Sequence, residues 1–143
     1  ARLVFSGRLP LAEHLARHRL ANLFLDTFPY GAHTTASDAL WTGLPVLTCM
    51  GESFASRVAA SLLNATGMPE LVTASLPEYE ARALELATDA VLLGRVRDKL
   101  ARNLPTASLF DTALFTRHLE QAYAMMVERQ RAGKMPGHFS VPA

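Results

Sequence analysis

The sequence has one cysteine, no long apolar run and no excess of charge of either sign, and each shortage excludes a class of protein. Cys49 is the single cysteine among 143 residues, so no internal disulfide can form, and we expect a reducing compartment, the cytoplasm. No run reaches the roughly 18 apolar residues of a membrane-spanning helix, so no membrane partner is expected. The net charge is +1, with acids and bases interspersed. That pattern argues against nucleic-acid binding, which needs clustered positive charge.

Three common signatures of phosphate binding are also absent. No Gly-Lys-Ser/Thr occurs, which excludes a P-loop, and no Gly-x-Gly-x-x-Gly occurs, which excludes the dinucleotide fingerprint. No Asp-x-Asp occurs, so a metal-bridged diphosphate would lack its usual ligands. We therefore expect neither a metal ion nor a cofactor.

Short apolar runs alternate with helical patterns along the chain. The apolar runs predict strands at residues 3–6, 23–25, 46–49 and 71–72. Periodicity and terminal signals predict helices over residues 10–22, 34–42, 53–67, 75–100 and 111–132, with a joint in the fourth near Gly94. The alternation predicts an α/β fold, a mostly parallel sheet with helices on both faces.

The first predicted strand begins almost at the chain end, so we expect a sheet that is truncated at its N-terminus. Half of the residues are apolar, which is enough for a core of one domain, expected over residues 1–132. Gly133 and Pro136 end the last helix, and residues 133–143 are expected to form a flexible tail. The single tryptophan, Trp41, is expected in the core.

The candidate site lies where a strand, a Gly-containing loop and a helix start follow one another. The loop after the strand at residues 23–25 leads to His33-Thr34-Thr35, which opens a helix. Ligands of open α/β sheets bind outside the carboxyl ends of strands, and helix starts offer unpaired N–H groups to anions. Two hydroxyls and an imidazole add donors that suit a diphosphate, while Asp38, one turn later, suits a sugar hydroxyl. The spacing equally fits a helix that Thr34 or Thr35 merely caps.

Two longer stretches carry a resemblance to a known family. Residues 33–46 and 51–61 resemble the nucleotide-sugar site of the O-linked N-acetylglucosamine transferases, glycosyltransferase family 41. Shorter matches at residues 78–80 and 108–111 follow in the family's order, so the resemblance covers nearly the whole chain. It implies the C-terminal, donor-binding half of a GT-B fold, which is Rossmann-like, in a bacterial relative.

The resemblance also implies roles for individual residues. His33, Thr34 and Thr35 would hold the diphosphate of UDP, and Asp38 would hold the ribose. The family reaction transfers N-acetylglucosamine, with inversion, from UDP-N-acetylglucosamine to Ser or Thr hydroxyls of proteins. Without a metal, helix N-termini and hydrogen-bond donors would stabilise the leaving diphosphate.

Further roles lie at the start of the chain and in the second long stretch. The backbone of Leu9 would contact the base and His14 would pack against uracil, whereas spacing alone favours a surface helix residue at His14. Leu11 departs from the family, which has a lysine near the ribose there. Arg57 is either a solvated helix charge or a contact to the donor or acceptor.

The resemblance assigns no catalytic residue to this chain. In the family, a catalytic half lies upstream, and tetratricopeptide repeats bind the protein acceptor. We therefore expect this chain alone to be inactive. Two alternatives stay open: a non-catalytic protein-interaction module that keeps the fold, and a transferase with another UDP-sugar or a nitrogen acceptor.

Overall fold

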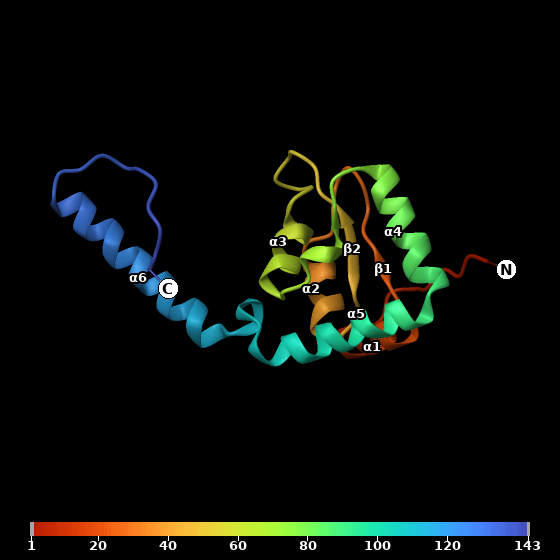
Figure 1. Cartoon of the computed structure of the whole chain (residues 1–143). Coiled ribbons are helices and arrows are strands. Elements are labelled where there is room, and N and C mark those ends of the chain that lie inside the picture. Colours follow the sequence, from red (N-terminus) through yellow and green to blue (C-terminus); the bar gives the residue numbers. More distant parts are fainter. Residues whose placement is uncertain (1, 143) are drawn as a thin grey trace. The chain divides into compact units, whose positions relative to one another are not determined.

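The computed structural model describes residues 2–142 and divides the chain into two compact units. The first runs up to Ala107 and contains the sheet, and the second begins at Ser108 (Figure 1). The domain predicted over residues 1–132 runs across this division. Its first residue, Ala1, and the last residue of the predicted tail, Ala143, lie outside the described residues.

The first unit is built on a parallel sheet in the order β1, β2, β3. Strand β1 (Phe24–Leu25) pairs with β2 (Val46–Cys49), with Phe24 opposite Val46. Strand β2 also pairs with β3 (Val72–Thr73), with Thr48 opposite Val72. All four residues of β2 are buried, as the central strand of a parallel sheet requires.

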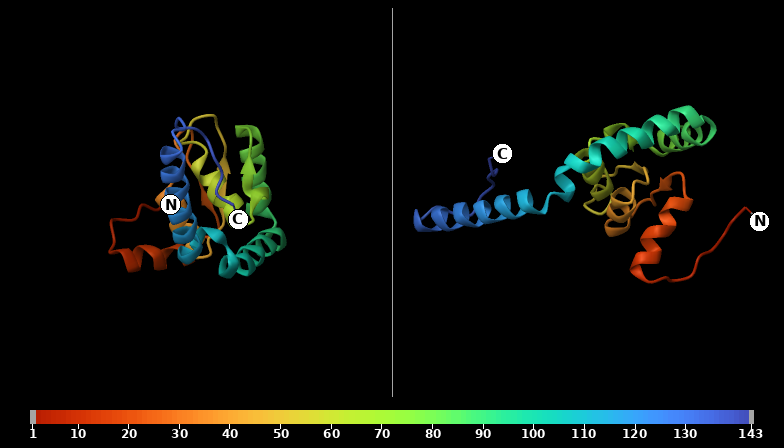
Figure 2. Two further views of the ribbon diagram at one scale, coloured as in Figure 1. Left: turned by 90° about the vertical axis from the view of Figure 1, so that its left-hand side faces the viewer. Right: turned by 90° about the horizontal axis from the view of Figure 1, so that it is seen from below.

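Helices cover both faces of this sheet, which confirms the predicted α/β architecture. Helices α2 (Thr34–Trp41) and α3 (Val58–Ala65) lie on one side and α4 (Leu76–Thr88) on the other (Figure 1). Helix α1 (Leu11–Arg17), which continues into the 3-10 turn η1 (His18–Leu20), lies beside α2 (Figure 2). The fully buried core includes Leu40, Leu47, Leu63, Met68, Leu71, Leu86 and Leu100.

Local terminal signals explain where most helices begin and end. Gly43 follows α2 with φ +81, a backbone conformation that glycine adopts without strain. Ser75 caps α4 by accepting the backbone N–H of Glu78 at 3.4 Å. The predicted joint near Gly94 is wrong, because α5 (Ala90–Asn103) begins directly after Asp89. The helix breaks there because the Asp89 carboxylate accepts the first N–H groups of α5.

Three other predictions fail where tertiary context decides. Residues 3–6 form no strand and pair with none of the three described strands, so their N–H and C=O groups face solvent. Helix α3 begins at Val58 rather than at Ser53, because Ser53 caps a turn instead by bonding to Ser56. Trp41 is 61% exposed at the end of α2 and is not a core residue.

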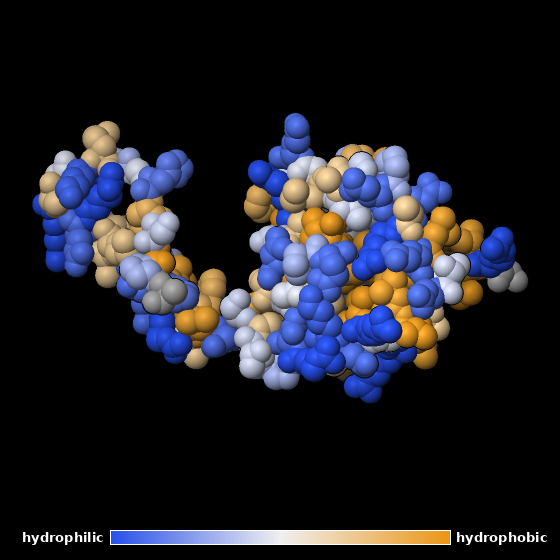
Figure 3. Space-filling view, viewed as in Figure 1, coloured by the Kyte–Doolittle hydropathy of each residue, from blue (hydrophilic) through white to orange (hydrophobic). Residues whose placement is uncertain are grey.

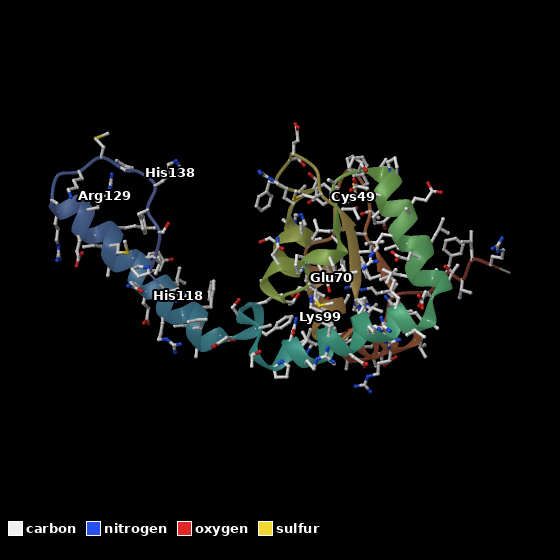
Figure 4. All side chains as sticks on the ribbon, viewed as in Figure 1. Cys49, Glu70, Lys99, His118, Arg129 and His138 are labelled. Carbon is white, nitrogen blue, oxygen red and sulfur yellow. The ribbon has the colours of Figure 1, made fainter. Side chains whose placement is uncertain are left out.

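Two 3-10 turns follow α3 and α5, and the first of them contacts α5 through an ion pair. Turn η2 (Pro69–Leu71) leads into β3, and turn η3 (Leu104–Thr106) ends the first unit. Lys99 of α5 forms an ion pair with Glu70 of η2 at 2.8 Å (Figure 4). The pair is partly exposed, so it orients α5 more than it stabilises it.

The second unit consists of turn η4 (Ser108–Phe110), helix α6 (Thr112–Arg131) and the segment that follows. The last helix, predicted to start at Asp111, begins one residue later, and Asp111 caps it by accepting the N–H of Leu114 at 2.8 Å. No residue of α6 is buried, and apolar and charged side chains share its surface (Figure 3). Residues 134–142 form no helix or strand, although Arg129 Nε donates to the Met135 carbonyl at 2.6 Å. Their flexibility stays a prediction. Among the described residues, no helix combines the length and apolar character needed to cross a membrane.

The cap at Asp89 gives a direct test of how α4 and α5 are separated. Asp89→Ala should lower the free energy of unfolding by about 1 kcal/mol, since two helix N–H groups lose their acceptor. Urea denaturation followed by circular dichroism measures the change. Asp98→Ala, which removes the same charge inside α5, should cost less than about 0.5 kcal/mol. Equal losses in the two variants would contradict the assignment of the cap.

Candidate functional site

The loop between β1 and α2 closes around the carboxylate of Asp26, the residue after β1. This side chain is only 7% exposed. Its Oδ1 accepts the backbone N–H groups of Thr27 at 2.8 Å and of Ala32 at 2.6 Å. Its Oδ2 accepts the hydroxyl of Thr48, on β2, at 2.7 Å. Both ends of the loop and the neighbouring strand therefore meet on one carboxylate.

Two further hydrogen bonds extend this network to β3 and α4. The Thr73 hydroxyl donates to the carbonyl of Thr48 at 3.0 Å, and the Tyr79 hydroxyl donates to the carbonyl of Asp26 at 2.9 Å. Burial raises the pKa of Tyr79, and the charges of Asp26 and Cys49 add to that rise. Tyr79 therefore stays a donor at neutral pH. The carboxyl ends of all three strands are tied together.

Helix α2 begins at this edge without a side-chain cap. His33 occupies the N-cap position and makes no capping hydrogen bond. Thr34 and Thr35, the first two residues of the helix, are exposed. The alternative in which a threonine caps the helix is therefore not what the structure shows. The first-turn N–H groups remain available to an anion, and the two hydroxyls lie beside them.

The ring of His33 is held by three neighbours. It stacks on Tyr30, with ring centroids 5.4 Å apart, and meets the edge of Phe54 at 5.9 Å. Its Nε2 lies 3.3 Å from the carbonyl of Ala55, which also accepts the N–H of Gly31 at 3.2 Å. Since a carbonyl only accepts, Nε2 carries the proton. That leaves Nδ1 as the ring nitrogen for a ligand.

Helix α1 carries a second polar cluster, around Arg17. Its guanidinium donates to His14 Nδ1 at 2.7 Å, to Ser6 Oγ at 2.9 Å and to the Gly7 carbonyl at 3.1 Å. Because arginine only donates, His14 Nδ1 is the acceptor, and a neutral His14 carries its proton on Nε2. Arg17 thus joins α1 to the segment that leads to Leu9, which is itself exposed.

His18 connects this cluster with α2. Its ring lies 5.0 Å from that of His14 in an edge-to-face arrangement. Burial lowers the pKa of His18, the charges of His14 and Arg17 lower it further, and the nearby carboxylate of Asp38 opposes them. His14 and Asp38, predicted to contact the base and the ribose, therefore both lie close enough to His18 to influence it.

An open pocket of about 630 Å³ lies at the carboxyl ends of the three strands. Mostly apolar groups line it, and it draws on the loops after all three strands. Its lining residues are Phe28, Pro29, Cys49, Met50, Gly51, Glu52, Ser53, Ser56, Ala74, Ser75 and Leu76. Cys49 lies near the upper end of β2 in Figure 4. None of the seven predicted site residues lines this pocket.

The predicted site residues thus fall into three places. Helix α2 and its cap carry His33, Thr34, Thr35 and Asp38. Helix α1 and the segment before it carry Leu9 and His14. The third place is the N-cap of α3, where Arg57 is exposed.

Sequence reasoning missed the residues that hold these groups. Asp26 stood directly before the loop, but nothing in its local pattern marks burial. Arg17 and His18 lie one turn beyond His14, and that i, i+3 and i, i+4 spacing was a usable signal. Within residues 2–142, no three His, Cys, Asp or Glu side chains are grouped so as to hold a metal ion.

Comparison with known proteins gives concordant matches. The family model "Glycosyl transferase family 41" matches residues 1–119. A Caenorhabditis elegans protein, described as a UDP-N-acetylglucosamine–peptide N-acetylglucosaminyltransferase, is 39% identical over 98% of this chain and 12% of its own length. An Arabidopsis thaliana protein, SEC, described as a probable enzyme of the same kind, is 37% identical over 97% of this chain and 14% of its own.

A solved structure gives the fold independently. A mutant O-GlcNAc transferase from Thermobaculum terrenum superimposes with a TM-score of 0.77 and 41% identity. The match covers 82% of this chain and 23% of the solved one. The likeness confirms the predicted GT-B type of α/β fold. The chain spans only a small part of the length of each relative.

The surroundings of His18 predict how stability depends on pH. Because the folded state lowers the pKa of His18 below 6.5, the folded state binds fewer protons there than the unfolded state. The contribution of His18 should be present above pH 6.5 and decline as the pH falls through the lowered pKa. Wild type should therefore lose free energy of unfolding relative to His18→Gln between about pH 7 and pH 5. Urea denaturation at each pH measures the difference, and the value at pH 8 gives the pH-independent effect of the substitution. A difference that stays constant with pH would contradict the prediction.

Proposed function

The chain belongs to glycosyl transferase family 41, and from that premise we propose that it forms the UDP-binding portion of a glycosyltransferase. The whole protein would transfer N-acetylglucosamine from UDP-N-acetylglucosamine to Ser or Thr hydroxyls of proteins. The names of the C. elegans and A. thaliana relatives support the donor and a peptide acceptor. One observation carries the proposal: α2 opens, uncapped, at the carboxyl end of β1 with His33, Thr34 and Thr35 at its start.

The diphosphate end of the donor would lie at the start of α2. The first-turn N–H groups there carry partial positive charge, worth about 0.3–1 kcal/mol per anionic contact at an exposed site. The hydroxyls of Thr34 and Thr35 add donors, and His33, whose Nε2 already bonds to Ala55, would donate from Nδ1 in its imidazolium form. These groups would stabilise the charge that grows on UDP as it leaves, so the proposed reaction needs no metal ion and no cofactor.

The nucleoside end would lie between α2 and α1. Asp38 would accept a ribose hydroxyl, His14 would pack against uracil, and the backbone of Leu9 would contact the base. The arrangement around His18 supports this, since both the ring of His14 and the carboxylate of Asp38 act on that histidine. Arg57 is exposed at the N-cap of α3 and would contact donor or acceptor from there.

The remaining parts of the reaction would come from outside this chain. We propose an upstream catalytic half that closes the cleft and tetratricopeptide repeats that bind the protein acceptor, so that this chain alone is inactive. The small share of each relative that the chain covers supports this. A cytoplasmic location is supported by the single cysteine, which is free and buried. The likeness to the T. terrenum structure supports a bacterial source.

Calorimetric titration of UDP into the chain tests the proposed site. Wild type should bind with saturable heat, and His33→Ala and Asp38→Ala should each weaken binding about tenfold, the value of one lost hydrogen bond of about 1.4 kcal/mol. His118→Ala on α6 and Asp98→Ala on α5 remove the same groups elsewhere and should leave the affinity unchanged. Absence of saturable heat, or equal affinities in all variants, would contradict the proposed site.

The whole protein, incubated with labelled UDP-N-acetylglucosamine and candidate protein acceptors, tests the reaction itself. Transfer of the label to Ser or Thr is the expected result. UDP binding without transfer or hydrolysis would favour the alternative of a non-catalytic interaction module. Transfer only from another UDP-sugar, or to a nitrogen atom, would correct the donor or the acceptor while leaving the site in place.

A further inference from the structure

We propose that Asp26 is the positioning residue of the diphosphate end of the site, although it contacts no ligand itself. The inference rests on the proposed function, because it concerns how the UDP-binding groups are held. Its starting point is a carboxylate that is 7% exposed and accepts three hydrogen bonds. A buried charge is tolerated only when donors surround it, and two of these three donors belong to the loop that leads to His33.

The hydrogen bonds close the loop from the inside. Asp26 Oδ1 accepts hydrogen bonds from the N–H of Thr27, at the loop's beginning, and from the N–H of Ala32, at its end. The hydroxyl of Thr27 then donates to the carbonyl of Tyr30 at 2.6 Å. Ala32 is followed at once by His33, the N-cap of α2. The position of the imidazole and of the first turn therefore depends on where Ala32 is held.

The loop is also held from the outside. Gly31 is buried, and its N–H donates to the carbonyl of Ala55 at 3.2 Å. A Cβ at Gly31 would lie 3.0 Å from Asp26 Oδ2 and 3.1 Å from the Ala55 carbonyl, closer than side chains normally approach. The same carbonyl meets His33 Nε2. The backbone is thus enclosed between Asp26 and Ala55.

The nucleoside end of the site has a different support. Leu9 and His14 come from α1 and the segment before it, which Arg17 holds through Ser6 and Gly7. No hydrogen bond of Asp26 reaches these residues. Loosening Asp26 should therefore affect recognition of the diphosphate and spare recognition of the base, which a general loss of stability would not do.

The experiment compares the affinities of UDP and of uridine for the full chain by ligand-observed NMR titration. In Asp26→Asn the loop amides keep an oxygen acceptor but lose its charge, and the new NH₂ group faces the hydroxyl of Thr48. This variant should bind UDP about tenfold more weakly and uridine within about twofold of wild type. Thr48→Val removes one donor to the carboxylate and should shift the same ratio in the same direction by a smaller factor.

Each outcome decides something. Two outcomes would overturn the positioning role alone. The first is a ratio of UDP affinity to uridine affinity that equals the wild-type ratio in folded Asp26→Asn and Thr48→Val. The second is a loss of affinity for both ligands that runs parallel to a loss of thermal stability. If wild type binds UDP no more tightly than uridine, the proposed diphosphate contacts are overturned, and the positioning role of Asp26 with them. If Asp26→Asn does not fold, the test rests on Thr48→Val, which leaves the carboxylate and the loop amides in place. The ratio of its UDP and uridine affinities then decides whether Asp26 has the positioning role.

Discussion

The buried carboxylate of Asp26 is the constraint on which the carboxyl edge of the sheet depends. Within residues 2–142 it is the sole acidic or basic residue among the buried ones. Removing a charge from water is costly, and only a full set of donors offsets the cost. Those donors are the two ends of one loop and Thr48 of the central strand. The desolvation cost thus favours this loop conformation, because one that withdraws either loop amide would leave the charge with fewer donors.

The two ends of the proposed UDP site are consequently held in different ways. The start of α2 continues from a loop enclosed by Asp26 and Ala55, so its N–H groups have a defined direction. The nucleoside end depends on Arg17, whose hydrogen bonds to Ser6 and Gly7 are exposed to solvent. Exposed contacts of long side chains contribute little stability each. Residues 2–10 are themselves exposed, so we expect ligand binding to supply more of the ordering at the nucleoside end.

Sequence patterns predicted the parts of the fold that are decided locally. The alternation of strands and helices, the end of α2 at Gly43, the cap Ser75 and the start of α6 near Asp111 all depend on residues within one turn of each other. The failures depend on distant partners. Residues 3–6 have the composition of a strand but no described strand beside them, and the turn at Ser53 is held by Ser56 rather than continued into a helix.

The site shows the same division between contact residues and the residues that hold them. His33, Thr34 and Thr35 could be proposed as ligand contacts from the sequence because their chemistry and their place at a helix start suffice to suggest an anion. Asp26 could not be recognised in this way, since a carboxylate after a strand gives the same sequence pattern whether it is solvated or buried. Its partner Thr48 lies 22 positions away. Groups that meet a ligand are selected for their own chemistry, which one residue carries. A positioning residue is defined by its partners, so it becomes visible only once the chain has folded around it.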